Sequence, residues 1–230
     1  MAEQVERLVQ GRESLTHGVS HALRTPLARL RFALELIDLA DDAKGRSKRI
    51  REATDDVEKL EALVRELLTY SSLHSDQAPA IATEPADVQT LLKALVTDAR
   101  RVGPEITLEL TMKGDNGEVS LDVKLFLRVV RNLVNNAMRY ADGSVIVTLR
   151  RAPTYLAVLV DDDGPSVPEE EPDNIFEPFS RLDAARRRDT DEIGLDLPIA
   201  SGAAKAHRGC VEVRDSPLGG AQFAWVMTLD

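Results

Sequence analysis

Apolar residues recur about every 3.5 positions in two long segments at the start of the chain. In the first segment, alternating steps of four and three residues separate Leu23, Leu27, Leu30, Leu34 and Ile37. In the second segment, steps of seven, three, four and three residues separate Ile50, Val57, Leu60, Val64 and Leu67. A polar stretch over residues 40–45 lies between them. The spacing predicts two long helices in an antiparallel hairpin. Because one hairpin buries too little of this apolar seam, we expect two copies to pair into a four-helix bundle.

The pattern changes in the second half of the chain. Residues 74–86 are rich in Ala, Pro, Ser and Thr, which predicts a linker. After this linker, periodicity predicts helices over 88–102, 123–140 and 197–207, and strands over 106–112, 119–121, 145–149, 156–160, 211–213 and 223–229. This order predicts an α+β domain with a mixed sheet that helices cover on one face. The long polar segment 163–193 is expected to be functional, because unstructured loops of that length are uncommon in compact domains.

Composition excludes several classes of protein. The net charge of −10 argues against a general nucleic-acid binder, because few cations are left over to neutralise phosphates. A single cysteine, Cys210, rules out an intrachain disulfide framework and indicates a reducing compartment. We expect this cysteine to be a small buried residue of a strand. No run of about 18 apolar residues predicts a membrane span, and the charged amphipathic start, residues 3–13, indicates a fragment of a longer protein.

The first candidate for chemistry is a histidine on the first predicted helix, in the segment Ser20-His21-Ala22-Leu23-Arg24-Thr25-Pro26-Leu27. A lone histidine on a helix is more often structural than catalytic. Here Thr25 follows one turn later on the same face, and Pro26 removes one helical hydrogen bond. An accessible imidazole at such a position is a candidate nucleophile.

This segment resembles the H-box of sensor histidine kinases. The resemblance implies that His21 carries a phosphoryl group and that Thr25 supports dephosphorylation of a partner. It further implies that residues 14–73 form a dimerisation and phosphotransfer domain. Residues 1–13 would then be the end of a HAMP-like signalling helix.

Three later segments resemble motifs of the GHKL ATP-binding fold. The segment from Asn132 to Tyr140 is similar to the N-box, Val160 to Ser166 to the Asp-x-Gly-x-Gly box, and Ile175 to Asp183 to the F-box that opens the ATP lid. The resemblance implies that residues 87–230 form a Bergerat-type α/β sandwich that binds ATP and Mg²⁺. An aspartate and a glycine in a row are also ordinary turn chemistry, and two asparagines on a helix mean little without the other motifs.

The resemblance also implies roles for the matching residues. Asn136 would ligate Mg²⁺, Arg139 would meet a phosphate, Tyr140 would lie against adenine or ribose, and Asp162 would accept a hydrogen bond from the adenine amino group. Phe179 would anchor the lid on the sheet. The full implied ATP-binding set is Asn132, Asn136, Arg139, Tyr140, Asp162, Gly164, Phe179, Arg181, Gly194 and Leu195.

Three residues depart from the family pattern. Ala22 follows the histidine where the family usually has an acid that accepts the imidazole proton, a role that contributes about 10²–10⁴-fold. Glu192 and Asp196 replace glycines of the Gly-x-Gly-x-Gly box, and each carboxylate beside a phosphate would cost about 3–4 kcal/mol. Asp196 also has a structural interpretation, as the N-cap of the helix predicted to start at Leu197. We therefore expect weak nucleotide binding.

Taken together, the motifs predict the kinase portion of a two-component sensor, which phosphorylates His21 from ATP and passes the phosphoryl group to an aspartate of a response-regulator receiver domain. The expected assembly is a homodimer through residues 14–73, with no nucleic-acid partner. The parent protein is expected in the bacterial inner membrane, with this portion in the cytoplasm and the membrane reached only through segments outside this sequence. A kinase-impaired dimer that binds the regulator or acts as a phosphatase is the alternative, and a GHKL ATPase of the chaperone or topoisomerase type is a third.

Overall fold

The structure is a computed structural model of the chain. It describes residues 2–38, 43–75, 81–114, 117–168, 174–180 and 194–229, and for residues 2–17, 21, 38 and 43 it describes the backbone alone.

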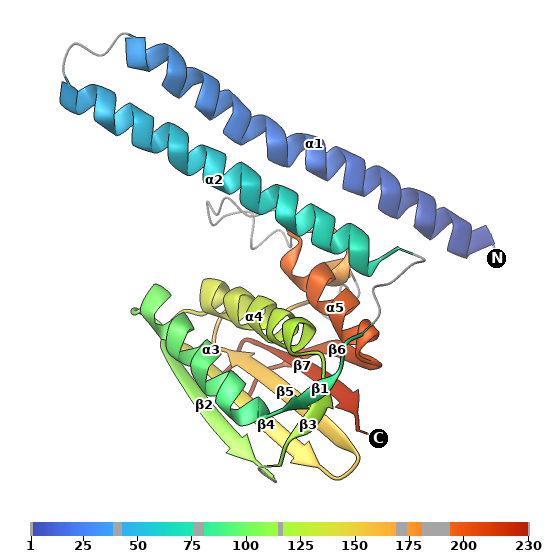
Figure 1. Cartoon of the computed structure of the whole chain (residues 1–230). Coiled ribbons are helices and arrows are strands. Elements are labelled where there is room, and N and C mark those ends of the chain that lie inside the picture. The colour runs from blue at the N-terminus through green and yellow to red at the C-terminus, as the bar shows by residue number, and fades with distance from the viewer. Residues whose placement is uncertain are drawn as a thin grey trace.

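Two long antiparallel helices form the first part of the molecule, as predicted (Figure 1). Helix α1 spans Ala2–Asp38 and continues through Pro26, and helix α2 spans Ala43–Leu73. Small and apolar side chains are buried where the helices meet, among them Ala33, Ala53 and Leu63. A second stripe at heptad spacing stays between 41% and 54% exposed: Leu27, Leu34, Ile50, Val57 and Val64. One hairpin therefore leaves an apolar face uncovered.

The second part is an α+β domain with a five-stranded mixed sheet, which confirms the predicted fold class. The strand order is β2 (Thr107–Lys113), β4 (Ser144–Ala152), β5 (Tyr155–Asp162), β7 (Ala221–Thr228) and β6 (Gly209–Asp215). The first pair is parallel and the other pairs are antiparallel. One face of the sheet is covered by the helices α3 (Val88–Val102), α4 (Val123–Tyr140) and α5 (Asp196–Ala206) (Figure 1).

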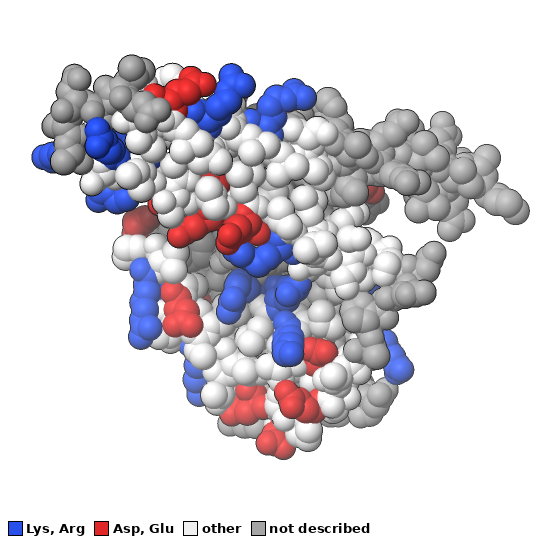
Figure 2. Space-filling model, turned by 45° about the horizontal axis from the view of Figure 1, so that its top comes forward, with Lys and Arg blue, Asp and Glu red and all other residues white. Residues whose placement is uncertain are grey.

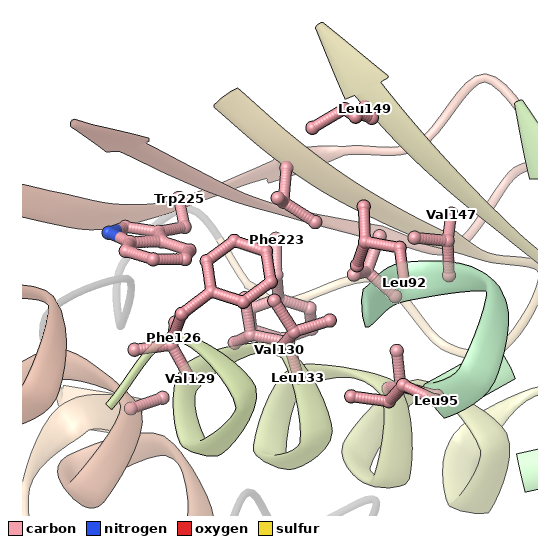
Figure 3. Close-up of a cluster of buried hydrophobic side chains, with 14 of the residues drawn as sticks. Leu92, Leu95, Phe126, Val129, Val130, Leu133, Val147, Leu149, Phe223 and Trp225 are labelled. Atoms are coloured by element: carbon pink, nitrogen blue, oxygen red, sulfur yellow. The ribbon is translucent and has the colours of Figure 1, made fainter. Parts of the chain in front are cut away.

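The core of this domain lies between α4 and the sheet. Phe126, Val130 and Leu133 point from the apolar face of α4 toward Phe223 and Trp225 of β7 (Figure 3), and all five side chains are at most 2% exposed. The opposite face of α4 is polar, as expected for a helix at the edge of a core. This amphipathic division fixes the orientation of α4, and hence the direction of its polar side chains.

Two local features differ from the sequence-based expectation. The segment predicted as a linker contains a short strand, β1 (Glu84–Ala86), which pairs antiparallel with β3 (Val119–Leu121). Three residues with a central proline carry no strand signal, so a tertiary partner determines this strand. Cys210 lies in a strand as predicted, but it is exposed rather than buried.

Asp122 fixes the start of α4, and its removal is expected to destabilise the domain. Its carboxylate accepts hydrogen bonds from the backbone N–H groups of Leu125 and Ala82, at 3.1 and 3.2 Å. Burial raises the pKa of Asp122, but these hydrogen bonds outweigh burial, and the net pKa is lowered from 3.8.

The stabilisation of the fold by ionised Asp122 is thus present above pH 3.8 and is lost as the pH falls through the lowered pKa. Asp122→Ala should cost about 1 kcal/mol of unfolding free energy at pH 7. Urea unfolding checks this, and equal stability of the two proteins at pH 7 would contradict it.

Candidate nucleotide and phosphoacceptor site

The last two turns of α4 carry the polar side chains predicted to bind nucleotide. Asn132, Asn136, Arg139 and Tyr140 are spaced so that they lie along neighbouring positions of one helix. Asn136 is only 8% exposed, while Asn132, Arg139 and Tyr140 are half-buried. The structure thus brings the four predicted residues together beside the C-terminal end of β5.

Asp162 ends β5 and is nearly inaccessible, at 1% exposed. Its Oδ1 accepts hydrogen bonds from the backbone N–H groups of Gly164 and Ala221, at 3.0 and 3.2 Å. Burial raises the pKa of this carboxyl, and the two hydrogen bonds offset burial only in part. Because both bonds end on Oδ1, they leave Oδ2 for a ligand. A Cβ on Gly164 would lie 2.2 Å from the carbonyl oxygen of Tyr140, so only glycine allows β5 and α4 to approach this closely.

Asp196 occupies the phosphate end of the predicted pocket. It is the first residue of α5, and its Oδ2 lies 3.0 Å from Nη1 of Arg139. The side-chain amide of Asn132 donates to the backbone carbonyl of Asp196, also at 3.0 Å. Burial raises the pKa of Asp196, and the guanidinium of Arg139 partly lowers it again. A protein carboxylate therefore pairs with the arginine that the family resemblance assigns to a phosphate.

The predicted capping role of Asp196 is wrong. Helix α5 begins at Asp196 itself, and the preceding residue, Leu195, has no side-chain capping hydrogen bond. The carboxylate forms an ion pair with Arg139 instead, because a full positive charge is a stronger partner than a neutral backbone N–H group.

The helical hairpin packs directly against this end of the domain. Leu63 of α2, Leu195 just before α5 and Ile199 of α5 are at most 3% exposed and form one apolar cluster. Arg128 of α4 donates a 2.6 Å hydrogen bond to Oγ1 of Thr69 on α2. Figure 2 shows acidic and basic side chains side by side along the boundary between the hairpin and the α/β domain.

Glu66 is a partly buried charged residue of α2 that interacts electrostatically with Asp196 and Arg139. Its pKa is raised from 4.5 to about 7, first by burial and then by the charge of Asp196, while Arg139 and Arg65 lower it. The hairpin therefore contributes a proton-binding carboxyl to the surroundings of the Arg139–Asp196 pair.

Phe179 contacts the hairpin, whereas we expected it to anchor the lid on the sheet. A Cβ on Gly18 of α1 would lie 2.1 Å from its ring, and the ring also belongs to the cluster around Leu63 and Leu195. Its φ of 62° is unusual for a bulky residue. Phe176 packs on the main core of the α/β domain. Phe179 thus packs on the hairpin and not on the sheet, because Gly18 in α1 leaves room for its aromatic ring.

The remaining predicted residues divide into two groups. Gly194 has a φ of 69° and its carbonyl accepts from the N–H of Phe179, while Leu195 is buried in the interface with the hairpin. Thr25 is exposed on α1. The side chain of His21 and all of Arg181 and Glu192 lie outside the described residues.

Sequence reasoning missed two acidic residues of this region. Glu66 interrupts the apolar face of α2 that includes Leu63, Leu67 and Tyr70, and this break in the pattern was a usable signal. Asp163 follows Asp162 directly, and its Oδ1 accepts from three successive backbone N–H groups. Nothing in the sequence distinguishes it from an ordinary loop aspartate.

Over the described ranges, the helices include none that is long and apolar enough to cross a membrane. Within the same ranges, no group of three or more His, Cys, Asp or Glu side chains is arranged to hold a metal ion.

Both halves of the chain match a family model. Residues 12–76 match the His Kinase A (phospho-acceptor) domain, and residues 121–230 match the family of histidine kinase-, DNA gyrase B-, and HSP90-like ATPases. The chain therefore belongs to the two-component sensor histidine kinases, of which it comprises the phosphoacceptor and ATPase-type domains.

A curated relative agrees with this assignment, and two solved structures share the fold. Sensor protein RstB of Escherichia coli K12 is 37% identical over 225 residues, which cover 98% of this chain and 51% of RstB. The chain thus spans about half the length of this curated relative. The structure of histidine kinase AdeS of Acinetobacter baumannii is similar with a TM-score of 0.72 at 22% identity, covering 91% of this chain and 98% of AdeS. A full-length ShkA structure in complex with AMPPNP has a TM-score of 0.69 at 23% identity, covering 99% of this chain and 46% of ShkA.

Proposed function

We propose that this chain phosphorylates His21 from ATP and passes the phosphoryl group to an aspartate of a response regulator. The contact between Gly18 and Phe179 supports this proposal most directly. It lies three residues from His21, so the ATPase-type domain and the phosphoacceptor helix meet within one helical turn of that residue. Both domains match kinase family models.

The pocket residues fit a nucleotide with a divalent cation. Oδ2 of Asp162 would accept a hydrogen bond from the adenine amino group, and the amide oxygen of Asn136 would ligate Mg²⁺. A neutral oxygen ligand suits this ion where the triphosphate supplies the negative charge. Bound Mg²⁺ would supply charge neutralisation for the triphosphate. The AMPPNP complex of the structurally similar ShkA supports nucleotide binding by this fold.

In the proposed reaction an imidazole nitrogen of His21 attacks the γ-phosphorus of ATP. The bond from that phosphorus to the β,γ-bridging oxygen breaks, ADP leaves, and the ring loses a proton. The receiver aspartate then attacks the same phosphorus and the imidazole is released. Because Ala22 has no carboxylate, solvent or another side chain must accept the first proton. Thr25, which is exposed, would orient a water that attacks the aspartyl phosphate of the regulator, so that the aspartate and inorganic phosphate are released.

We also propose a homodimer through residues 14–73, based on the exposed stripe of α1 and α2. Val57 is 41% exposed in one chain, so pairing would bury the remaining surface in both copies. Val57→Ala removes two methyl groups per copy, and each fully buried group of this size contributes about 0.8 kcal/mol. Because pairing would bury only the fraction that one chain leaves exposed, this energy is multiplied by that fraction and then doubled for the two copies. Val57→Ala should therefore weaken dimerisation about tenfold. Sedimentation equilibrium checks this, and an unchanged dissociation constant would contradict the proposed interface.

The parent protein is proposed to be a bacterial inner-membrane receptor with this portion on the cytoplasmic side. The support is that the chain covers only 51% of RstB, so the relative has a further portion with room for a sensor.

One observation favours a second candidate, a kinase-impaired dimer that binds the regulator or acts as its phosphatase. The ion pair between Asp196 and Arg139 places a carboxylate where phosphate charge must go. In this candidate the chain takes no phosphate from ATP. Replacing both Glu192 and Asp196 with glycine should then restore phosphorylation.

Incubation with γ-labelled ATP and Mg²⁺ tests the proposal. The kinase candidate predicts acid-labile label on the wild-type chain and none on His21→Ala. Label on the doubly glycine-substituted chain alone would favour the second candidate. Label that persists in His21→Ala would exclude both.

A further inference from the structure

We propose that Asp163 is a positioning residue that fixes the two halves of the nucleotide pocket relative to each other. The inference rests on the proposed binding of ATP at this site. The first half is the end of β5, where Asp162 and Gly164 would hold the base. The second half is the end of α4, where Asn136 and Arg139 would hold the metal and phosphates.

One carboxylate oxygen links these halves. Oδ1 of Asp163 accepts hydrogen bonds from the backbone N–H groups of Asp142, Gly143 and Ser144, at 2.9, 3.0 and 3.0 Å. Asp142 and Gly143 connect Ala141, the C-cap of α4, to Ser144, the first residue of β4. Successive N–H groups that converge on one anion form a nest, and a full charge strengthens each bond.

The chain itself connects the two halves only indirectly. Between α4 and β5 lies the whole of β4, so the covalent chain does not hold Tyr140 next to Asp162 directly. The backbone N–H of Asp163 also donates to the carbonyl of Ser144 at 3.3 Å, so backbone and side chain bind the same turn. Gly164 lies against the carbonyl of Tyr140, which shows how closely the two halves approach. Asp163 itself touches no residue assigned to the metal or the phosphates in the described contacts.

If Asp163 positions the two halves, its removal should lower the affinity of a ligand more when the ligand spans more of the pocket. ATP–Mg²⁺ would use both halves in full, whereas adenosine would use the base half and, of α4, only Tyr140. Asp163→Ala should therefore raise the dissociation constant for ATP–Mg²⁺ about tenfold and that for adenosine less than about twofold. Asp163→Asn keeps a side-chain oxygen that can accept the same hydrogen bonds, and it should recover most of the ATP affinity.

Asp87→Ala is a matched control, because Asp87 also holds backbone N–H groups, at the start of α3, and belongs to neither half of the pocket. Calorimetric titrations of the complete chain with ATP–Mg²⁺ and with adenosine are made for the parent, both Asp163 variants and the control. They are repeated in an Asp196→Gly background, so that the competing carboxylate does not hide binding. Equal losses for both ligands would show a merely structural role and overturn the proposal.

Two further outcomes separate this inference from the function on which it depends. A parent that binds ATP and an Asp163→Ala variant that binds it equally well would overturn the positioning role alone. A parent that binds no ATP in either background would overturn the proposed function and the positioning role with it.

Discussion

Replacing Asp196 with glycine is expected to tighten ATP–Mg²⁺ binding about a hundredfold. In the native chain the Asp196 carboxylate lies 3.0 Å from Arg139, so phosphate must displace it or lie beside it. A like-charge contact at 4–5 Å costs about 3–4 kcal/mol at an effective dielectric constant near 20, and screening lowers this toward 2–3 kcal/mol. The substitution also restores the open helix N-terminus at which α5 can receive an anion.

An isosteric variant separates charge from bulk in this experiment. Asp196→Asn removes the charge but keeps the side-chain volume, and it should recover at least half of the gain in binding free energy if electrostatics dominates. Calorimetric titration of the three proteins at one salt concentration measures the affinities. A glycine variant that binds ATP no more tightly than the native chain would show that the Arg139–Asp196 pair does not limit binding.

Deprotonation of Glu66 is expected to weaken docking of the α/β domain on the hairpin about tenfold as the pH rises from 4.5 to 7. Glu66 has an ordinary pKa of 4.5 when free, and burial against Asp196 raises that pKa to about 7 in the docked arrangement. The docked state thus holds a proton that the undocked state has released, so the contribution of Glu66 to docking is complete below pH 4.5 and is lost as the pH rises through 7. The charged groups that face Glu66 are Asp196 of α5, Arg139 of α4 and Arg65 of α2. Because Glu66 is only partly buried, the effect is discounted for solvent screening.

A histidine at the same interface opposes this effect at low pH. His74 stacks on Tyr70 and lies against Gly202 of α5, and burial lowers its pKa below 6.5. Protonation of His74 therefore weakens docking as the pH falls below 6.5. Small-angle X-ray scattering between pH 5 and 8 should show a more extended wild-type chain at the alkaline end. Glu66→Gln should stay compact there, while Glu61→Gln, which alters an exposed acid of the same helix, should behave as wild type. Identical curves for Glu66→Gln and wild type would contradict the role of Glu66.

Periodic apolar patterns predicted most of the fold. The helix over 123–140 and the strand over 119–121 agree with α4 and β3 at both ends, because each has strong spacing and an aspartate or a turn at its boundary. Strand β1 was not predicted, since Glu84–Ala86 has a proline at its centre and forms only by pairing with β3. The intrinsic strand propensity of three residues does not reveal a pairing partner that is distant in the sequence.

The candidate site was predictable where residues share one helix or one strand end. Asn132, Asn136, Arg139 and Asp162 converge as expected, because α4 packs beside the end of β5. The contact of Phe179 with Gly18 was not predictable, since 160 residues separate the two and only domain packing joins them. The partner of Asp196 was mispredicted for the same reason: a cap is local, whereas Arg139 is distant in the sequence.

Phosphorylation of His21 by ATP is the central claim, and one labelling experiment tests it most directly. The native chain and the Glu192→Gly, Asp196→Gly double variant are incubated with γ-labelled ATP and Mg²⁺ at millimolar concentration, each with and without His21→Ala. We predict acid-labile label on both parents, more of it on the double variant, and none wherever His21 is alanine. Absence of label from both parents, or label that survives His21→Ala, would contradict the account.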